Sequence, residues 1–174
     1  TSGRARIDAL RPVAIEDLLG RDPVPPVPEL LGPGLRNSVV CVTGAGGSIG
    51  SELCLQILQL APKTLILLES SEPSLYAVEQ ELSQQLPASV TLVPVLGSAA
   101  DPALVQRLFS SHGVQTVFHA AAYKHVPLVE ANPLAGLANN VGSTRVVCQA
   151  AVAAGVTELV LISTDKAVRP TNVM

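Results

Sequence analysis

The chain has 174 residues, of which 48% are hydrophobic and only 2% aromatic, and its formal net charge at neutral pH is −3. The apolar residues are mainly Val, Leu, Ile and Ala, a composition typical of a parallel sheet that is buried on both faces. The acidic balance, the few aromatic side chains and the lack of a basic cluster argue against nucleic-acid binding. No uninterrupted run of about 18 apolar residues occurs, so the sequence predicts no transmembrane helix.

The first 36 residues are predicted to form a segment of their own. Residues 13–19 are compatible with a short helix that ends at Gly20, and residues 22–34 contain five of the 14 prolines. Proline fixes the backbone angle φ and removes an amide donor, which indicates an extended linker. We therefore divide the chain into a helix with a Pro-rich linker at 1–36 and a domain at 37–174. An opening of this kind is typical of a piece of a longer protein.

Apolar strands alternate with amphipathic helices over the rest of the chain. The strands are predicted at 38–43, 64–69, 90–96, 116–121 and 159–163. The helices are predicted at 49–60, 73–86, 102–110 and 133–154. Short connections between such units imply parallel strands joined by right-handed crossovers. The sequence thus predicts an α/β fold with a doubly wound parallel sheet of the Rossmann type.

A glycine-rich segment, TGAGGSIG at 43–50, follows the first strand and precedes the first helix of this domain. Small residues there let backbone amides approach a pyrophosphate, whose charge the helix N-terminus favours. Glycines also form ordinary turns, but the order strand, turn, helix favours a dinucleotide site. The expected cofactor-binding residues of this segment are Thr43, Gly44, Gly46, Gly47, Ser48, Ile49 and Gly50.

Glu69 ends the second predicted strand, 19 residues after Gly50. In a dinucleotide-binding fold, an acid at this place accepts hydrogen bonds from the adenosine ribose and repels a 2′-phosphate. The sequence therefore favours NAD over NADP, although Ser70 and Ser71 leave NADP open. A solvated acid at a strand end is the other interpretation of Glu69.

Four segments in order identify a family resemblance. They are TGAGGSIGSEL at 43–53, HAAAYKHVPLVE at 119–130, NNVGST at 139–144 and STDKAVRPTNVM at 163–174. Together they closely resemble the UDP-N-acetylglucosamine 4,6-dehydratases of bacterial polysaccharide biosynthesis, within the extended short-chain dehydrogenases. The segment LRPVAIEDLLGRDPV at 10–24 resembles the membrane-anchored branch of that family. The resemblance implies bound NAD(P), a UDP-sugar substrate and a homo-oligomer. It also implies a place at the cytoplasmic face of the inner membrane, reached through regions outside this chain.

The resemblance also assigns catalytic roles at the end of the fifth predicted strand. In this family, a hydride leaves sugar carbon C4 for the dinucleotide, water is lost across C5–C6, and the hydride returns to C6. By resemblance, Thr164 hydrogen-bonds the C4 oxygen, Asp165 protonates the departing C6 hydroxyl and Lys166 takes the C5 proton. The carboxyl ends of strands are where doubly wound sheets present their active sites. The alternative is a purely structural role, in which Asp165 and Lys166 form a surface pair that caps the end of the strand.

Other positions carry weaker expectations. Ala120, Ala121 and Ala122 let the backbone approach the cofactor or simply pack closely, and Lys124 and His125 face the sugar nucleotide or are structural. Asn140 matches the asparagine that supports the active-site strand in the superfamily, or makes a core hydrogen bond. Ser98 and Ala99 follow the third predicted strand near the expected adenine, where relatives often carry Asp at the position of Ser98.

The catalytic tyrosine of short-chain dehydrogenases falls on Met174, which cannot exchange a proton. Its partner lysine and the C-terminal substrate-binding portion would lie beyond residue 174, so this chain alone is expected to be inactive. The sequence leaves two other functions open: a nucleotide-sugar 4-epimerase or dehydrogenase, and a silent dinucleotide-binding module. Elimination requires Asp165 and Lys166, whereas the alternatives do not. No metal site is expected, because the three cysteines, Cys41, Cys54 and Cys148, lack ligand-like spacing and read as core residues in a reducing compartment.

Overall fold

The computed structural model describes residues 34–173. The predicted helix at 13–19, nearly all of the predicted linker and Met174 lie outside the described residues. The strands are β1 (Val39–Thr43), β2 (Thr64–Glu69), β3 (Thr91–Leu96), β4 (Thr116–His119) and β5 (Glu158–Leu161). The α-helices are α2 (Ser48–Gln59), α3 (Glu72–Ser83), α4 (Pro102–His112), α5 (Val126–Ala131), α6 (Pro133–Gly136) and α7 (Ser143–Ala154). A π-helical turn, η2 (Leu137–Gly142), joins α6 to α7, and a 3-10 turn, η3 (Asp165–Ala167), follows β5.

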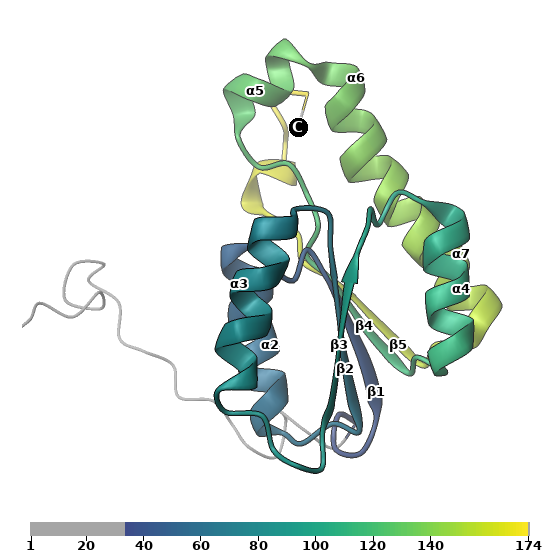
Figure 1. Ribbon diagram of the computed structural model, residues 1–174. Coiled ribbons are helices and arrows are strands. Elements are labelled where there is room, and N and C mark those ends of the chain that lie inside the picture. Colours follow the sequence, from purple (N-terminus) through teal and green to yellow (C-terminus); the bar gives the residue numbers. More distant parts are fainter. Residues whose placement is uncertain (1–33, 174) are drawn as a thin grey trace, which may run out of the picture. The chain divides into compact units, whose positions relative to one another are not determined.

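The five strands form one parallel sheet with the order β3-β2-β1-β4-β5. Helices α2 and α3 cover one face and α4 and α7 cover the other, as Figure 1 shows. The doubly wound fold predicted from the sequence is therefore confirmed. The strand order reverses between β1 and β4, and such a switch point opens a crevice outside the carboxyl ends of the strands.

The core consists of two apolar clusters, one on each face of the sheet. Val40 and Val42 of β1 belong to the cluster beneath α2 and α3, whereas Cys41 belongs to the cluster beneath α4 and α7. This division follows from the alternation of side chains along a strand. Both faces of β1 are therefore buried, which agrees with its unbroken apolar sequence.

Two of the three cysteines behave as the predicted core residues. Cys41 and Cys54 are buried, and burial raises the pKa of both thiols, that of Cys54 to about 12. Cys148 is exposed, so the core interpretation is wrong for this residue. It follows the buried Val147 on α7, and one step along a helix turns a side chain about 100° around the axis.

The helix ends show why the chain turns where it does. Asp101 caps α4, because its carboxylate accepts hydrogen bonds from the amides of Ala103 and Leu104 at 2.9 and 3.0 Å. The same helix ends at Gly113, whose left-handed conformation (φ 61°) suits glycine. From β1 to α4 the boundaries lie within two residues of those predicted, except that α3 ends three residues before its predicted end at 86.

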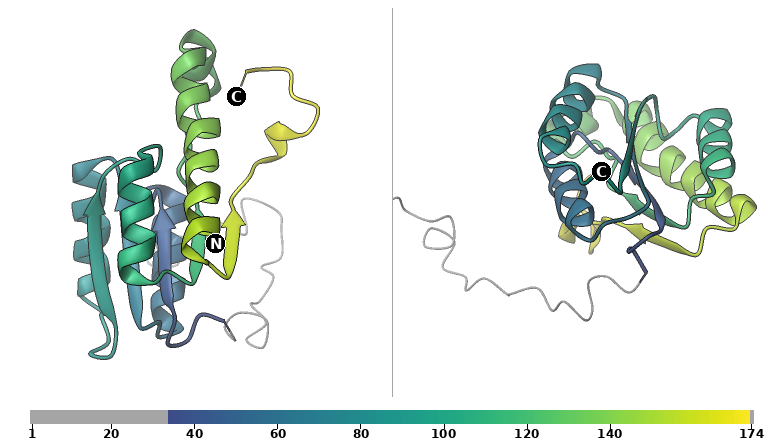
Figure 2. Two further views of the ribbon diagram at one scale, coloured as in Figure 1. Left: turned by 90° about the vertical axis from the view of Figure 1, so that its right-hand side faces the viewer. Right: turned by 60° about the horizontal axis from the view of Figure 1, so that its bottom comes forward.

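The region after β4 differs most from the prediction. The strand ends at His119 rather than 121, because beyond the backbone bond from Ala120 N to Thr43 O the chain leaves the sheet. A short helix, α5, occurs where none was predicted. The single helix predicted at 133–154 is helical over its whole length, but its middle part, η2, is a π turn that separates α6 from α7. In the left view of Figure 2 this long helix extends past the carboxyl ends of the strands, as does the segment after β5.

Candidate functional site

Two adjoining cavities, of about 670 and 230 Å³, open at the carboxyl ends of the strands. Four residues line both of them: Gly47, Ala120, Ala122 and Tyr123. The glycine-rich segment after β1 and the loop after β4 thus form the boundary between the two cavities. Together the cavities follow the switch point of the sheet, which is where this fold class binds its ligands.

The glycines of the segment after β1 are required by close packing. Gly44 has a φ of 67°, and a Cβ at this residue would lie 2.8 Å from the Cα of Ala121. A Cβ on Gly50 would lie 2.0 Å from the carbonyl oxygen of Gly44. Larger residues would therefore displace either the loop or the first turn of α2. The glycines keep the backbone at the surface of the cavities.

The N-terminus of α2 faces the larger cavity. Its N-cap residue is Gly47, and no side chain of the described residues caps the helix. Ser48, Ile49 and Gly50, the first residues of the helix, line the larger cavity. Their amides carry the positive pole of the helix, which favours an anion such as a pyrophosphate.

A cation strengthens this positive end. The Nζ atom of Lys124 donates a hydrogen bond to the Oγ atom of Ser48 over 3.3 Å. Lys124 and its neighbour His125 both line the larger cavity. The lysine predicted from the sequence to face the sugar nucleotide therefore lies beside the helix end that suits a phosphate.

Glu69 lines the smaller cavity. The same cavity is lined by Ser98 and Ala99, which the sequence places near the adenine, and by Gly44, Gly46 and Ala121. The Oε2 atom of Glu69 accepts a hydrogen bond from the amide of Gly46 at 3.1 Å. Its Oε1 atom accepts from the amides of Ser70 and Ser71 at 2.8 and 2.9 Å. The carboxylate is thus held in a fixed orientation at the end of β2.

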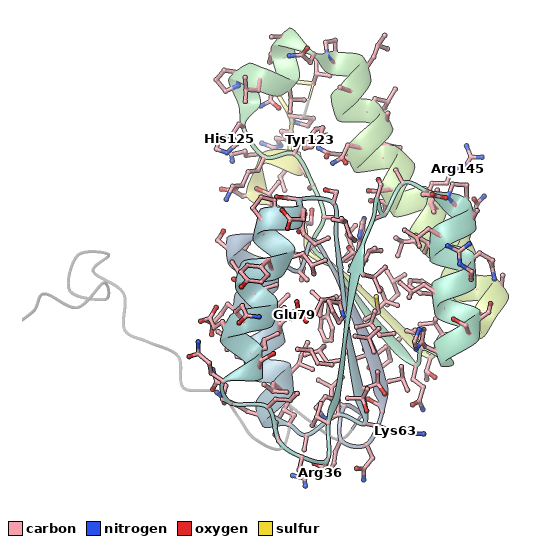
Figure 3. All side chains as sticks on the ribbon, viewed as in Figure 1. Arg36, Lys63, Glu79, Tyr123, His125 and Arg145 are labelled. Carbon is pink, nitrogen blue, oxygen red and sulfur yellow. The ribbon has the colours of Figure 1, made fainter. Side chains whose placement is uncertain are left out.

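The loop between β4 and α5 is fixed by Asn140, which lies in the π turn. The Oδ1 atom of Asn140 accepts from the amide of Tyr123 at 2.8 Å, and its Nδ2 donates to the carbonyl of Tyr123 at 3.1 Å. Asn140 also lines the larger cavity. Tyr123 was not among the predicted site residues, although it lies inside the HAAAYKHVPLVE segment. Figure 3 places Tyr123 and His125 at one end of the sheet, far from Arg36 and Lys63 at the other.

His119 is buried directly beneath this loop, with only 1% of its surface exposed. Its Nδ1 lies 2.6 Å from the Oγ1 of Thr43, and its Nε2 lies 3.1 Å from the Oγ1 of Thr144. Burial lowers the pKa of the imidazole from its ordinary value. Thr43, predicted to bind the cofactor, is itself buried and lines neither cavity among the described residues. The Oγ of Ser143 lies 3.4 Å from the same Nε2, and no sequence pattern predicted this group of four residues around His119.

The three predicted catalytic residues lie together at η3 and are exposed. The hydroxyl of Thr164 donates to the Oδ1 of Asp165 at 3.1 Å and accepts from the amide of Lys166 at 3.4 Å. Thr164 and Lys166 line the larger cavity, whereas Asp165 does not. The larger cavity is therefore lined by a hydroxyl, by two lysines, Lys124 and Lys166, and by the N-terminus of α2.

Two other findings concern residues 34–173 only. No group of three or more His, Cys, Asp or Glu side chains in this range could hold a metal ion. No helix in the same range is long and apolar enough to cross a membrane.

A model of the family described as polysaccharide biosynthesis protein matches residues 40–174. The chain is 43% identical over 173 residues to the capsular polysaccharide biosynthesis protein CapD of Staphylococcus aureus, covering 99% of this chain and 29% of CapD. It is 41% identical over 165 residues to EpsC of Bacillus subtilis, a probable polysaccharide biosynthesis protein, covering 95% of this chain and 28% of EpsC. The chain thus spans less than a third of the length of these relatives.

Solved structures with the same fold include two nucleotide-sugar enzymes. A UDP-glucose 4-epimerase from Stenotrophomonas maltophila, with bound NAD and formylated UDP-arabinopyranose, is 26% identical with a TM-score of 0.66, over 74% of this chain and 38% of the epimerase. A dTDP-glucose 4,6-dehydratase from Streptomyces venezuelae, with NAD bound, is 28% identical with a TM-score of 0.56, over 69% of this chain and 37% of the dehydratase.

Proposed function

The chain belongs to the polysaccharide biosynthesis protein family, and on that premise we propose that it is the dinucleotide-binding part of a nucleotide-sugar 4,6-dehydratase. The proposed substrate is UDP-N-acetylglucosamine, and the proposed product is the UDP-4-keto-6-deoxy sugar. One observation carries the proposal: two cavities adjoin at the glycine-rich segment, with an acid in the smaller and Thr164 and Lys166 in the larger.

The residues of the two cavities fit a nicotinamide dinucleotide. Glu69 in the smaller cavity suits the hydroxyls of an adenosine ribose. The uncapped N-terminus of α2 suits the pyrophosphate, and Gly44 and Gly50 allow the loop after β1 to pack closely against its neighbours and the first turn of this helix. The larger cavity would then receive the nicotinamide and the sugar. The carboxylate of Glu69 favours NAD over NADP, because a 2′-phosphate would face a like charge.

In this proposal, NAD supplies an acceptor for the C4 hydride, which it returns to C6. The residues of the chain handle the protons. Thr164 hydrogen-bonds the C4 oxygen, and Lys166 removes the C5 proton once the C4 ketone has made it acidic. Asp165 gives a proton to the C6 hydroxyl, which leaves as water, and Lys166 returns its proton to C5 when the hydride is added at C6. The C4 hydroxyl proton must pass to a base other than these three residues. For this step the Asp165 carboxyl must turn from Thr164, its partner in this structure, toward the cavity.

The test uses the full-length protein, which is incubated with UDP-N-acetylglucosamine. The mass of the nucleotide sugar is then followed by mass spectrometry. We expect the loss of one water from the nucleotide sugar without added NAD(P)H. The variant Lys166→Ala should abolish this loss while NAD+ still binds. The control Lys63→Ala, an exposed lysine at the opposite end of the sheet, should keep wild-type turnover.

Three outcomes would contradict the proposal. Full activity of Lys166→Ala would remove this residue from the mechanism. An unchanged mass with inversion at C4 would identify a 4-epimerase, the activity named for the structural neighbour from Stenotrophomonas maltophila. Bound dinucleotide without any change of the sugar would indicate a silent binding module or a different substrate.

A further inference from the structure

The hydrogen bonds around His119 fix the position of its proton. The Oγ1 of Thr144 lies 2.7 Å from the carbonyl oxygen of Asn140 and donates its single hydrogen there. Toward Nε2 of His119, at 3.1 Å, the same oxygen must therefore accept. It follows that Nε2 carries a hydrogen, and the Oγ of Ser143, at 3.4 Å from the same nitrogen, is then a second and more distant acceptor. In the neutral ring, Nδ1 is then an acceptor and receives the hydroxyl hydrogen of Thr43 over 2.6 Å.

These bonds run in one direction, from β1 to the π turn. The hydroxyl of Thr43 donates to His119, His119 donates to Thr144, and Thr144 donates to the Asn140 carbonyl. At its far end, the Asn140 side chain holds both backbone polar groups of Tyr123. Thr43 is the first residue of the glycine-rich segment, and Tyr123 lines both cavities. The chain of bonds thus connects the two segments that form the boundary between the cavities.

We propose that His119 is a positioning residue, neutral and protonated on Nε2, which holds the loop at 120–125 in place against the glycine-rich segment. Its importance for ligand binding rests on the proposed function, whereas its protonation state does not. A histidine bonded only within the sheet would stabilise the fold alone. His119 instead joins β1 to the helix that carries Asn140, and Asn140 sets the backbone of the cavity-lining loop.

The protonation state is tested by NMR of the full-length protein with 15N-labelled histidine at pH 7.5. The variant His119→Gln assigns the His119 signals by their disappearance. We expect Nε2 in the range of a protonated ring nitrogen and Nδ1 in the range of an unprotonated one. A ring protonated on Nδ1 alone, or on both nitrogens, would overturn the proposal. This result is independent of catalysis.

The positioning role is tested at Thr144, which keeps substitutions away from the ring itself. Thr144→Val retains the shape but loses the hydroxyl, and Thr144→Ser restores the hydroxyl. We expect Thr144→Val to weaken NAD+ binding about tenfold by calorimetric titration, and Thr144→Ser to bind within about twofold of wild type. Thr157→Val makes the same change at an exposed residue after α7 and should leave NAD+ binding unchanged.

The outcomes separate this inference from the proposed function. If Thr144→Val melts at a lower temperature but binds NAD+ as wild type does, His119 has a structural role only and the positioning role is wrong. If Thr144→Val does not fold, Thr144→Ala, which also lacks the hydroxyl, takes its place in the binding comparison, and the NMR signals still test the protonation state. If the wild-type protein binds no dinucleotide while the NMR signals are as expected, the proposed function fails and the assigned protonation state stands.

Discussion

Glu69 and Gly46 are joined by a hydrogen bond in which the amide of Gly46 donates to the Oε2 of Glu69 over 3.1 Å. The acid at the end of β2 therefore holds the glycine-rich segment after β1. The neighbouring amides of Ser70 and Ser71 turn toward the other oxygen of the same carboxylate. The group that would select the cofactor is thus also a group that shapes the loop.

The variant Glu69→Gln is expected to reduce the preference for NAD+. Two unit charges about 4 Å apart repel by about 1 kcal/mol in water and by about 4 kcal/mol near a protein surface. Removing the charge of this half-buried carboxylate should therefore strengthen NADP+ binding roughly tenfold or more. NAD+ binding should weaken several-fold, because a neutral acceptor binds ribose hydroxyls less strongly. Calorimetric titrations with both dinucleotides measure the two changes.

The control for this experiment is Glu81→Gln, which removes one charge from an exposed residue near the end of α3. It should leave the ratio of the two affinities unchanged. An unchanged ratio in Glu69→Gln would show that Glu69 does not discriminate between the cofactors.

Gly44 and Gly113 provide a matched test of the glycine-rich segment. Both have positive φ, 67° and 61°, so alanine at either residue costs roughly 1–2 kcal/mol of backbone strain. Only at Gly44 does a Cβ also meet a neighbour, the Cα of Ala121 at 2.8 Å. We expect Gly44→Ala to be the less stable variant in thermal unfolding and to bind NAD+ more than tenfold more weakly. Gly113→Ala should bind NAD+ as wild type does. Equal NAD+ affinities of the two variants would contradict the role of Gly44 in the dinucleotide site.

Lys124 is expected to bind a phosphate group of the ligands. Its hydrogen bond to Ser48 places the ammonium group beside the N-terminus of α2. A hydrogen bond to a charged group contributes about 1.5–3 kcal/mol, so Lys124→Gln should weaken binding of UDP or NAD+ at least tenfold. The loss should shrink as the salt concentration rises, because the interaction is exposed to solvent. Lys63→Gln serves as the charge control, and equal affinities of the two variants would contradict the assignment.

Stability should depend on pH through His119. Burial lowers the pKa of this imidazole in the folded protein, whereas the unfolded chain titrates near 6.5. Below about pH 6.5 the unfolded state therefore binds more protons, and the free energy of unfolding falls by up to about 1.4 kcal/mol per pH unit. This contribution is fully present above pH 6.5 and is lost as the pH falls toward the lowered pKa.

Denaturant unfolding of wild type and His119→Gln at pH 7.5 and 5.5 measures this dependence. The stability difference between the two proteins should be smaller at pH 5.5 by about 1 kcal/mol. Thr157→Val, at an exposed residue without a titratable side chain, should show no such convergence. A difference that is the same at both pH values would mean that His119 does not titrate as described.

The sequence predicts the sheet and the glycine-rich segment well, because both depend on local patterns. An unbroken apolar run such as β1 and a glycine with positive φ such as Gly44 leave a direct signal. The bond between Asn140 and Tyr123 leaves none, because it joins residues 17 positions apart through a loop without regular structure. The same holds for His119, whose partner Thr43 lies 76 positions away.

The helix at 133–154 shows a second limit of sequence patterns. Its apolar pattern predicts a single α-helix, although Asn139, Asn140 and Gly142 within η2 are weak helix formers. Within the turn, Asn140 has a tertiary partner, the backbone of Tyr123, which a local sequence pattern does not reveal. Likewise, Asp165 and Lys166 are adjacent in sequence, yet only Lys166 lines the larger cavity, whereas the carboxylate of Asp165 accepts a hydrogen bond from Thr164.

The π turn has a consequence for the phase of the long helix. It accommodates one residue more than an α-helical turn, and each residue advances an α-helix by about 100°. Ala135 before the turn lines the larger cavity, and Val147 after it is buried against the sheet. Deleting one residue from η2 would rotate these two faces relative to each other by about a quarter turn. The extra residue of the π turn therefore sets the rotation between the part of the helix that lines the cavity and the part that packs in the core. Inserting or deleting a residue between them would move one of the two faces out of place.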